Sequence, residues 1–240
     1  MYSSRYKENK MSVEILVNKK PIRVYCSNGK NYVEGRNNSE FEIQITNPLP
    51  YKVLAVPSVD GISIIDGKPA SAESSGYILH SGETITIPGW KVDNNTSAKF
   101  TFALREKSYA AVGEVNDTSN TGVIGVMFFN EKKSDVYDNS IFRGVTTIPF
   151  NGNYFDYMQI NHLLCASSYS EPEQELGTSF GKATDFKVKE VEFKRGDLLS
   201  TTVIFYDSKS NLVKRGIIKQ TVMRQEPNPF PGVGCKIPKG

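Results

Sequence analysis

The sequence predicts an all-β protein, a β-sandwich or jelly-roll-like fold of about ten strands with one short helix near the C-terminus. Apolar and polar residues alternate along several short segments, as they do in strands with one buried face. Turn residues separate these segments at irregular intervals, which favours a sandwich over a propeller. Residues 211–217 carry the only convincing helical pattern, with Asp207 or Ser208 as its N-cap.

Most of the predicted strands lie in the first half of the chain. They cover residues 12–17, 21–25, 40–46, 53–56, 84–87, 99–104 and 122–130. Asn28-Gly29 favours a type I′-like turn after the second of them, and Pro48 ends the third because proline cannot donate to a strand ladder. The segment 122–130 is the most apolar and is expected to be a central strand, with a bulge or a close backbone approach at Gly125.

The alternation weakens after residue 130. We expect a β-sandwich core over residues 12–130, an aromatic and polar excursion or small lobe over 131–184, and strands with the short helix over 185–222. One strand is expected at 202–206 and another over 186–194, with a bulge near Lys189 or Glu190. Residues 1–11 are predicted to be a flexible arm, and the Pro- and Gly-rich residues 223–240 a tail that is free or docked in an extended form.

Two Asp-Gly pairs enclose a short apolar run, residues 62–65, and are the strongest turn signal in the chain. Gly accepts a positive φ without a Cβ clash, and Asp tolerates it. We expect the chain to reverse at both pairs and to return to the core at the only tryptophan. The predicted structural turns are Asp60, Gly61, Asp66, Gly67, Pro88, Gly89 and Trp90.

No motif for catalysis, cofactor binding or metal binding has its required context. Residues 177–181 match G-x-S-x-G, but no strand-to-helix elbow surrounds Ser179 and both histidines precede it, so we expect a flexible Gly loop. A P-loop is excluded because its spacing is one residue short and Ala183 replaces the hydroxyl residue. His80 is expected in an exposed loop and His162 in a core. The candidate calcium ligands Asp60, Asp66 and Asp93 are explained by turn chemistry, so no cofactor and no metal is predicted.

The composition indicates an ordinary globular protein without a dominant charge. Its 240 residues carry 29 basic and 26 acidic side chains, for a net charge of +3, so no nucleic-acid partner is specifically indicated. No run is long and apolar enough for a signal peptide or a membrane span. Three widely spaced cysteines, Cys26, Cys165 and Cys235, are typical of reduced thiols rather than of a disulfide framework.

The segment 131–184 carries the best candidates for a contact surface. Its aromatic residues follow no spacing that places them on one buried face, and aromatics outside a core often mark interfaces, although a second small core accounts for them equally well. The predicted contact residues are Tyr137, Phe142, Tyr154, Phe155 and Tyr157.

Several of these motifs together resemble an uncharacterised β-rich protein family of phage and bacterial genomes. The resemblance covers residues 53–217 and rests on VDGISIIDGKPA, GYI, IPGW, GVIGV, GTSFG and YDS. The family offers no activity and no catalytic positions to transfer. What it implies is a virion or surface component rather than a metabolic enzyme.

The leading hypothesis is therefore a non-enzymatic structural or assembly protein, a capsid-associated, tail or fibre-anchoring component of a phage particle. Its expected partners are other copies of itself and other virion or surface proteins, and its expected location is the virion, assembled in the host cytoplasm, or else the cytoplasm itself. One alternative is a carbohydrate- or cell-surface-binding module that uses Trp90 and the tyrosine-rich segment. The other is an enzyme with an unrecognised carboxylate site.

Overall fold

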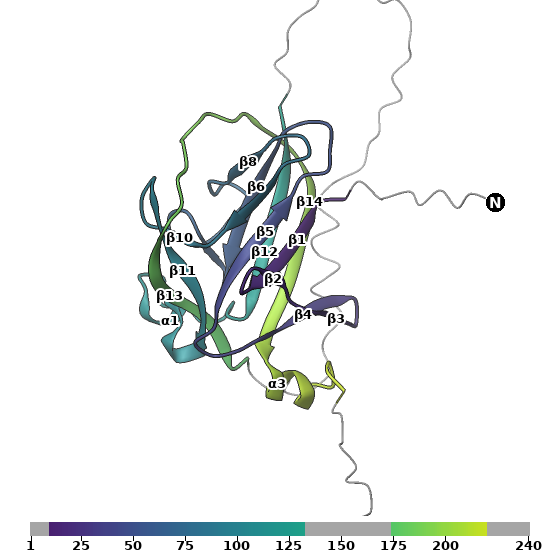
Figure 1. Ribbon diagram of the computed structural model, residues 1–240, viewed down its shortest axis with the longest axis vertical. Helices are drawn as coiled ribbons and strands as arrows, with labels where there is room; N and C mark the ends of the chain where they lie inside the picture. The colour runs from purple at the N-terminus through teal and green to yellow at the C-terminus, as the bar shows by residue number, and fades with distance from the viewer. Residues whose placement is uncertain (1–9, 133–173, 220–240) are drawn as a thin grey trace, which may run out of the picture.

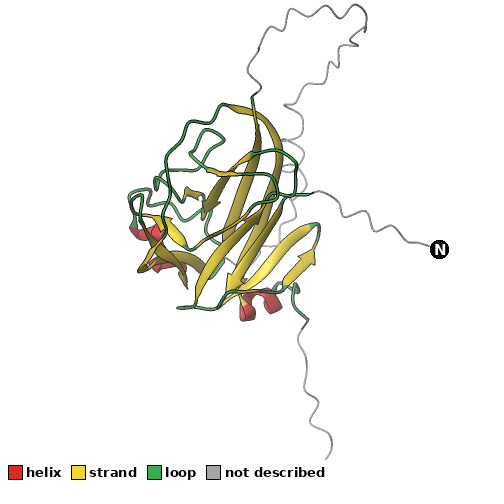
Figure 2. Ribbon diagram, turned by 45° about the horizontal axis from the view of Figure 1, so that its top comes forward, coloured by secondary structure: helices red, strands yellow, loops and turns green. Residues whose placement is uncertain are grey.

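The structure is a computed structural model that describes residues 10–132 and 174–219. It is an all-β sandwich of two seven-stranded sheets, with short helices only at its periphery (Figures 1 and 2). The predicted fold class is confirmed.

The first sheet has the order β10-β11-β5-β1-β2, with β13 beside β11 and β9 beside β5. Its strands are β1 (Ser12–Val17), β2 (Lys20–Pro21), β5 (Glu40–Thr46), β9 (Thr84–Ile87), β10 (Gly89–Lys91), β11 (Thr96–Leu104) and β13 (Leu176–Asp185).

The second sheet has the order β3-β4-β14-β12-β6-β7, with β8 beside β6. Its strands are β3 (Val24–Ser27), β4 (Lys30–Gly35), β6 (Val53–Val59), β7 (Ile62–Ser63), β8 (Tyr77–Leu79), β12 (Val123–Glu131) and β14 (Arg195–Ser208). The described helices are the 3-10 turn η1 (Arg105–Lys107), α1 (Tyr109–Val112) and α3 (Lys209–Lys214).

The core lies between the sheets because each sheet turns its alternate apolar residues inward. In β5 the side chains of Phe41, Ile43 and Ile45 are buried while their polar neighbours are half-buried or exposed. Phe41 stacks on Phe102 with ring centroids 4.3 Å apart. The prediction of β12 as a central strand is confirmed, since it lies between β14 and β6.

Two of the predicted turns have the expected backbone. Asn28 and Gly29 have φ of 49° and 72° and join β3 to β4 as a hairpin. Asp60 and Gly61 have φ of 54° and 76° and join β6 to β7. Positive φ at both central residues is the requirement of the type I′ turn.

Some boundaries differ from those predicted because the chain changes sheets there. The expected strand 21–25 is divided between β2 and β3, which belong to different sheets. Residues 186–194 form no regular strand, because they cross from β13 in the first sheet to β14 in the second. At Gly125 the structure has a close approach and no bulge, since a Cβ there would be 3.0 Å from Ser58 Oγ. The bulges of β12 in its pairing with β14 lie after Phe128.

The helices also differ in detail. The helix predicted over 211–217 instead begins at Lys209 and ends at Lys214, and Ser208 is its N-cap. The helix α1 was not predicted, because a single turn is too short to show helical periodicity. Its N-cap is Ser108, whose hydroxyl accepts from the Ala111 N–H.

Candidate interaction edge

The C-terminal half of β14 is fixed in the core by a buried carboxylate. Tyr206 donates its hydroxyl to Asp60 Oδ1 at 2.6 Å, and the Thr178 N–H donates to Asp60 Oδ2 at 2.7 Å. The Gly122 N–H donates to Oδ1 at 2.8 Å. Asp60 thereby connects the β6–β7 turn to the beginning of β12, to β13 and to β14.

Burial decides the electrostatics of this group. Desolvation raises the pKa of Asp60 from 3.8 to about 6, against the opposing effect of the hydrogen bonds that it accepts. Desolvation also raises the pKa of Tyr206 well above its usual value, and the neighbouring Asp60 adds to the effect. Asp60 is 2% exposed and both its oxygens are engaged. The arrangement is that of a structural clamp.

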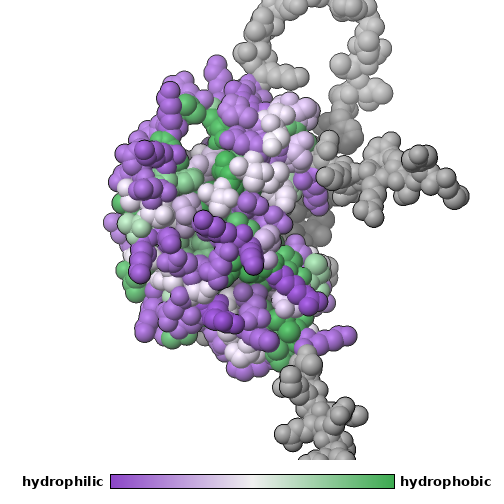
Figure 3. All heavy atoms as spheres, viewed as in Figure 1, coloured by the Kyte–Doolittle hydropathy of each residue, from purple (hydrophilic) through white to green (hydrophobic). Residues whose placement is uncertain are grey.

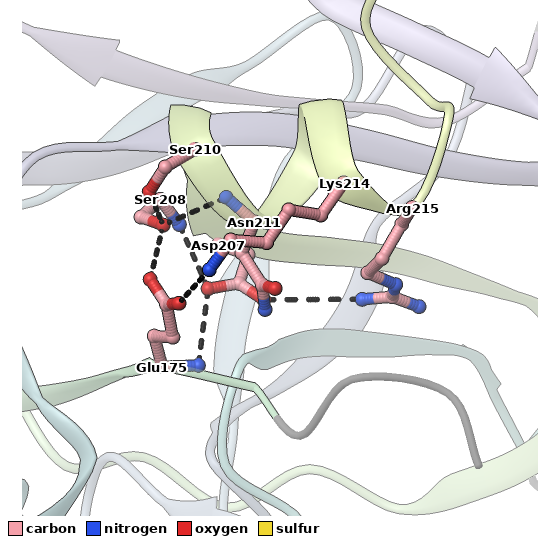
Figure 4. A network of polar contacts seen from close by, with 7 residues as sticks. All are labelled: Glu175, Asp207, Ser208, Ser210, Asn211, Lys214 and Arg215. Carbon is pink, nitrogen blue, oxygen red and sulfur yellow. Dashed lines mark hydrogen bonds and ion pairs between the residues drawn. The ribbon is translucent and has the colours of Figure 1, made fainter.

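A second polar network fixes the end of β14 and the beginning of α3 (Figure 4). Asp207 accepts from the Glu175 N–H at 3.1 Å and from Asn211 Nδ2 at 2.5 Å. Ser208 donates its hydroxyl to Glu175 Oε2 at 2.6 Å. The participating residues are Glu175, Asp207, Ser208, Ser210, Asn211, Lys214 and Arg215.

The two carboxylates of this network lie in different environments. Burial raises the pKa of Asp207, while the Ser208 hydrogen bond lowers that of Glu175. Arg215 Nη1 lies 3.9 Å from Asp207 Oδ2, and its guanidinium lies over the Tyr32 ring. The network joins β13, β14 and α3, so we assign it to the anchoring of the strand.

The N-terminal half of β14 is bonded on one side only. From Arg195 to Phe205 the strand pairs with β12, whereas β4 pairs with it only from Ile204 to Ser208. Within residues 10–132 and 174–219, no strand pairs with the other side of β14 from Arg195 to Val203. Such an edge presents unpaired backbone N–H and C=O groups to another chain.

The side chains along this edge favour pairing. No charged residue or proline occurs from Leu198 to Tyr206, although proteins commonly protect exposed edges with such residues. Leu198, Leu199 and Val203 are 45%, 38% and 39% exposed. Charged residues bound this uncharged run on both sides. Before it, Arg195 donates to the Ala72 and Ser74 carbonyls and the Asp197 N–H bonds Asn130, and after it Asp207 belongs to the network at α3.

The edge of the first sheet is also open on this side. β2 pairs only with Leu16 and Val17 of β1, and the Ile22 N–H bonds the Ile15 carbonyl, so Ser12 to Glu14 have β5 as their one partner strand in the described part of the chain. In the view of Figure 1, β1 of the first sheet and β14 of the second are both drawn toward the same flank of the sandwich. By contrast, the face in Figure 3 is mainly hydrophilic with smaller apolar patches. The open flank is therefore the candidate interaction site.

The predicted turns lie elsewhere and support the core. The chain reverses at both Asp-Gly pairs, since the Ser63 N–H bonds the Lys68 carbonyl and the Ala70 N–H bonds the Gly61 carbonyl. Gly67 has φ of 70°, and Asp66 is exposed.

The return of the chain at Pro88-Gly89-Trp90 closes this segment onto the core. The Lys91 N–H bonds the Ile64 carbonyl at 2.8 Å. Gly89 is required because a Cβ would be 1.9 Å from the Ala98 carbonyl oxygen. Trp90 is 2% exposed and packs against Phe100, so it cannot serve as the sugar platform of the carbohydrate hypothesis.

The predicted contact residues Tyr137, Phe142, Tyr154, Phe155 and Tyr157 lie outside the described residues, as do His162, Cys165 and Cys235. The open edge of β14 was not predicted, because its sequence is that of an ordinary strand. The available signal was an uncharged β-branched run, but sequence does not show which strands have two neighbours.

The expected Gly loop at 177–181 is wrong. These residues belong to β13, which pairs along β11. Gly177 and Gly181 permit close packing, since a Cβ on either would be 2.5 Å from a side chain, that of Ser108 or of Thr101. Ser179 donates to the Thr101 carbonyl at 3.3 Å.

The remaining histidine, cysteine and metal-ligand candidates show no sign of a reactive site in the described residues. His80 is exposed, as predicted, and its backbone N–H donates to the Glu83 carboxylate. Cys26 is a free, exposed thiol. In the described ranges, no group of His, Cys, Asp and Glu residues could hold a metal ion, and no helix is long and apolar enough to cross a membrane.

The comparisons with known proteins give no family assignment. No family model matches the chain, and neither the search of curated proteins nor that of solved structures returned a match. The relation to a phage and bacterial family stays an expectation from sequence.

Proposed function

We propose that the protein is a non-enzymatic assembly component that associates through protein–protein contacts, and that the open edge of β14 is its principal contact. The observation that carries this proposal is the uncharged run from Leu198 to Val203, which has exposed apolar side chains and, among the described residues, no strand paired with one side of its backbone. Addition of a strand to a sheet edge satisfies the backbone groups and provides affinity.

The geometry supports this function for a physical reason. The C-terminal half of β14 is held by Asp60 and Asp207. This anchoring makes the N-terminal half, which carries the open edge, a rigid extension of the sheet. A rigid edge loses little conformational entropy when a partner strand binds. The proposed partners are other copies of the chain and other virion or surface proteins, and the proposed location is the virion, assembled in the host cytoplasm, as the sequence resemblance suggests.

The test is the oligomeric state of the full chain. Sedimentation velocity over a range of concentrations should show reversible association of the wild type, and Val203→Lys should shift it toward monomer, since an edge lysine opposes strand addition. Val112→Lys is the matched control because Val112 is 71% exposed on α1. Unchanged association of Val203→Lys would refute the assigned contact. A chain that is monomeric in solution and missing from purified particles would refute the function.

A further inference from the structure

A pocket of about 330 Å³ opens at the end of the sandwich where the chain crosses between the sheets. Figure 1 shows β1 and β2 close to the β3–β4 hairpin at this end. Small-molecule sites in proteins begin at about this volume. The lining residues used in the argument are Val17, Ile22, Arg23, Glu34, Arg36 and Phe102.

The deeper part of the pocket is apolar. Phe102 is fully buried in the core, and Val17 and Ile22 pack against the same core. The pocket therefore reaches the interior of the sandwich from the surface. An apolar ligand body of a few carbon atoms would be removed from water there, which favours binding.

Two arginines line the same pocket. Arg23 and Arg36 are exposed, and neither makes an ion pair within the described residues. The guanidinium of Arg23 lies 5.0 Å from the centre of the Tyr25 ring, which also lines the pocket. Glu34 contributes the one carboxylate of the lining, so the formal charge of the pocket is positive.

The backbone around Arg36 is fixed by hydrogen bonds to β11. The Ser39 N–H bonds the Arg36 carbonyl at 2.9 Å, and the Asn38 N–H bonds the Phe102 carbonyl at 2.7 Å. The Phe102 N–H in turn bonds the Ser39 carbonyl at 3.0 Å. These contacts hold the backbone from which Arg36 projects, and a held group binds a ligand at a smaller entropic cost.

We propose that this pocket binds a small organic carboxylate with an apolar body. The guanidinium fork matches a carboxylate in plane and spacing, and the apolar interior accommodates the body. The site is distinct from the open edge of β14, and the proposal does not depend on the assembly function.

The test uses hexanoate as the probe and the full chain in isothermal titration calorimetry. Hexanoate should bind, and hexan-1-ol and acetate should each bind at least about tenfold more weakly, because one lacks the charge and the other the body. Arg36→Gln and Arg23→Gln should each weaken hexanoate binding by about tenfold or more. Glu34→Gln should strengthen it several-fold, since it removes a like charge.

Lys182→Gln is the matched control, because Lys182 is an exposed cation on β13 that does not line the pocket. Circular dichroism of each variant shows whether it is folded. Three results would overturn the proposal: no heat from hexanoate at millimolar concentration, equal binding of hexan-1-ol, or equal losses in Lys182→Gln and the arginine variants. A folded Glu34→Gln with weaker binding would also contradict it.

Discussion

The buried carboxylate of Asp60 should make the stability of this protein fall as the pH rises through weakly acidic values. Its pKa is about 6 in the folded protein and 3.8 when the group is free in water. Folding therefore favours the protonated form between these values. The contribution is fully present below pH 3.8 and is lost as the pH rises through about 6, with a total change of about 3 kcal/mol.

The variant Asp60→Asn isolates this contribution because it keeps the size and the tolerance of positive φ but cannot ionise. It also has a cost, because each carboxylate oxygen accepts an N–H, from Gly122 or from Thr178. An amide places its NH2 against one of these donors, which leaves a buried N–H unsatisfied at a cost of about 1–3 kcal/mol. Over the range of the assay the destabilisation caused by the variant should therefore be largest at pH 4 and about 2 kcal/mol smaller at pH 7.

The assay is urea unfolding at pH 4 to 7.5, followed by the fluorescence of Trp90, which is buried and unique in the chain. The difference between the two proteins removes the contributions of other titrating groups that behave alike in both. Asp66→Asn is the control, since this exposed carboxylate belongs to the second Asp-Gly pair. A stability difference that is constant with pH, or that grows toward pH 7, would refute the assignment of the pKa to burial.

Three further predictions concern a turn, the core and the N-cap of α3. Gly61→Ala should destabilise the protein more than Gly82→Ala. Both glycines have positive φ, but only at Gly61 would a Cβ meet a neighbour, Asn120 Cβ at 2.8 Å. Equal decreases in the melting temperature of the two variants would contradict this steric argument. Trp90→Ala removes a buried indole and should lower the free energy of unfolding by about 3–5 kcal/mol, as measured by circular dichroism in denaturant. A decrease below about 1 kcal/mol would show that the core repacks. Ser208→Ala removes the N-cap of α3 and the bond to Glu175, and should lower the free energy of unfolding by about 1–2 kcal/mol. Amide hydrogen exchange in α3 should become faster, while that in β5 stays unchanged.

Much of the fold follows from local pattern. The strict alternation at Phe41, Ile43 and Ile45 is enough to predict β5, because period-two burial has no other common origin. The turns at Asn28-Gly29 and Asp60-Gly61 follow from the need for positive φ at both central positions. These are interactions over a few residues, so a single sequence contains the information.

The changes of sheet were not predictable in the same way. Residues 186–194 mix apolar and charged residues as a half-buried strand would, yet they connect two sheets and form no ladder. The Gly-containing residues 177–181 have the composition of a loop, yet they are a strand because β11 offers a partner along its whole length. In both cases the availability of a neighbouring strand, and not propensity, decided the conformation.

The sequence by itself determined the all-β class, most strand positions and the Asp-Gly turns, since each depends on the conformational preferences of adjacent residues. Only the tertiary structure decided that Asp60 is a buried clamp, because its partners Thr178 and Tyr206 are 118 and 146 residues away in the chain. It also decided that, within residues 10–132 and 174–219, the N-terminal half of β14 has one neighbouring strand, because the number of partners of a strand depends on how the whole sheet is ordered.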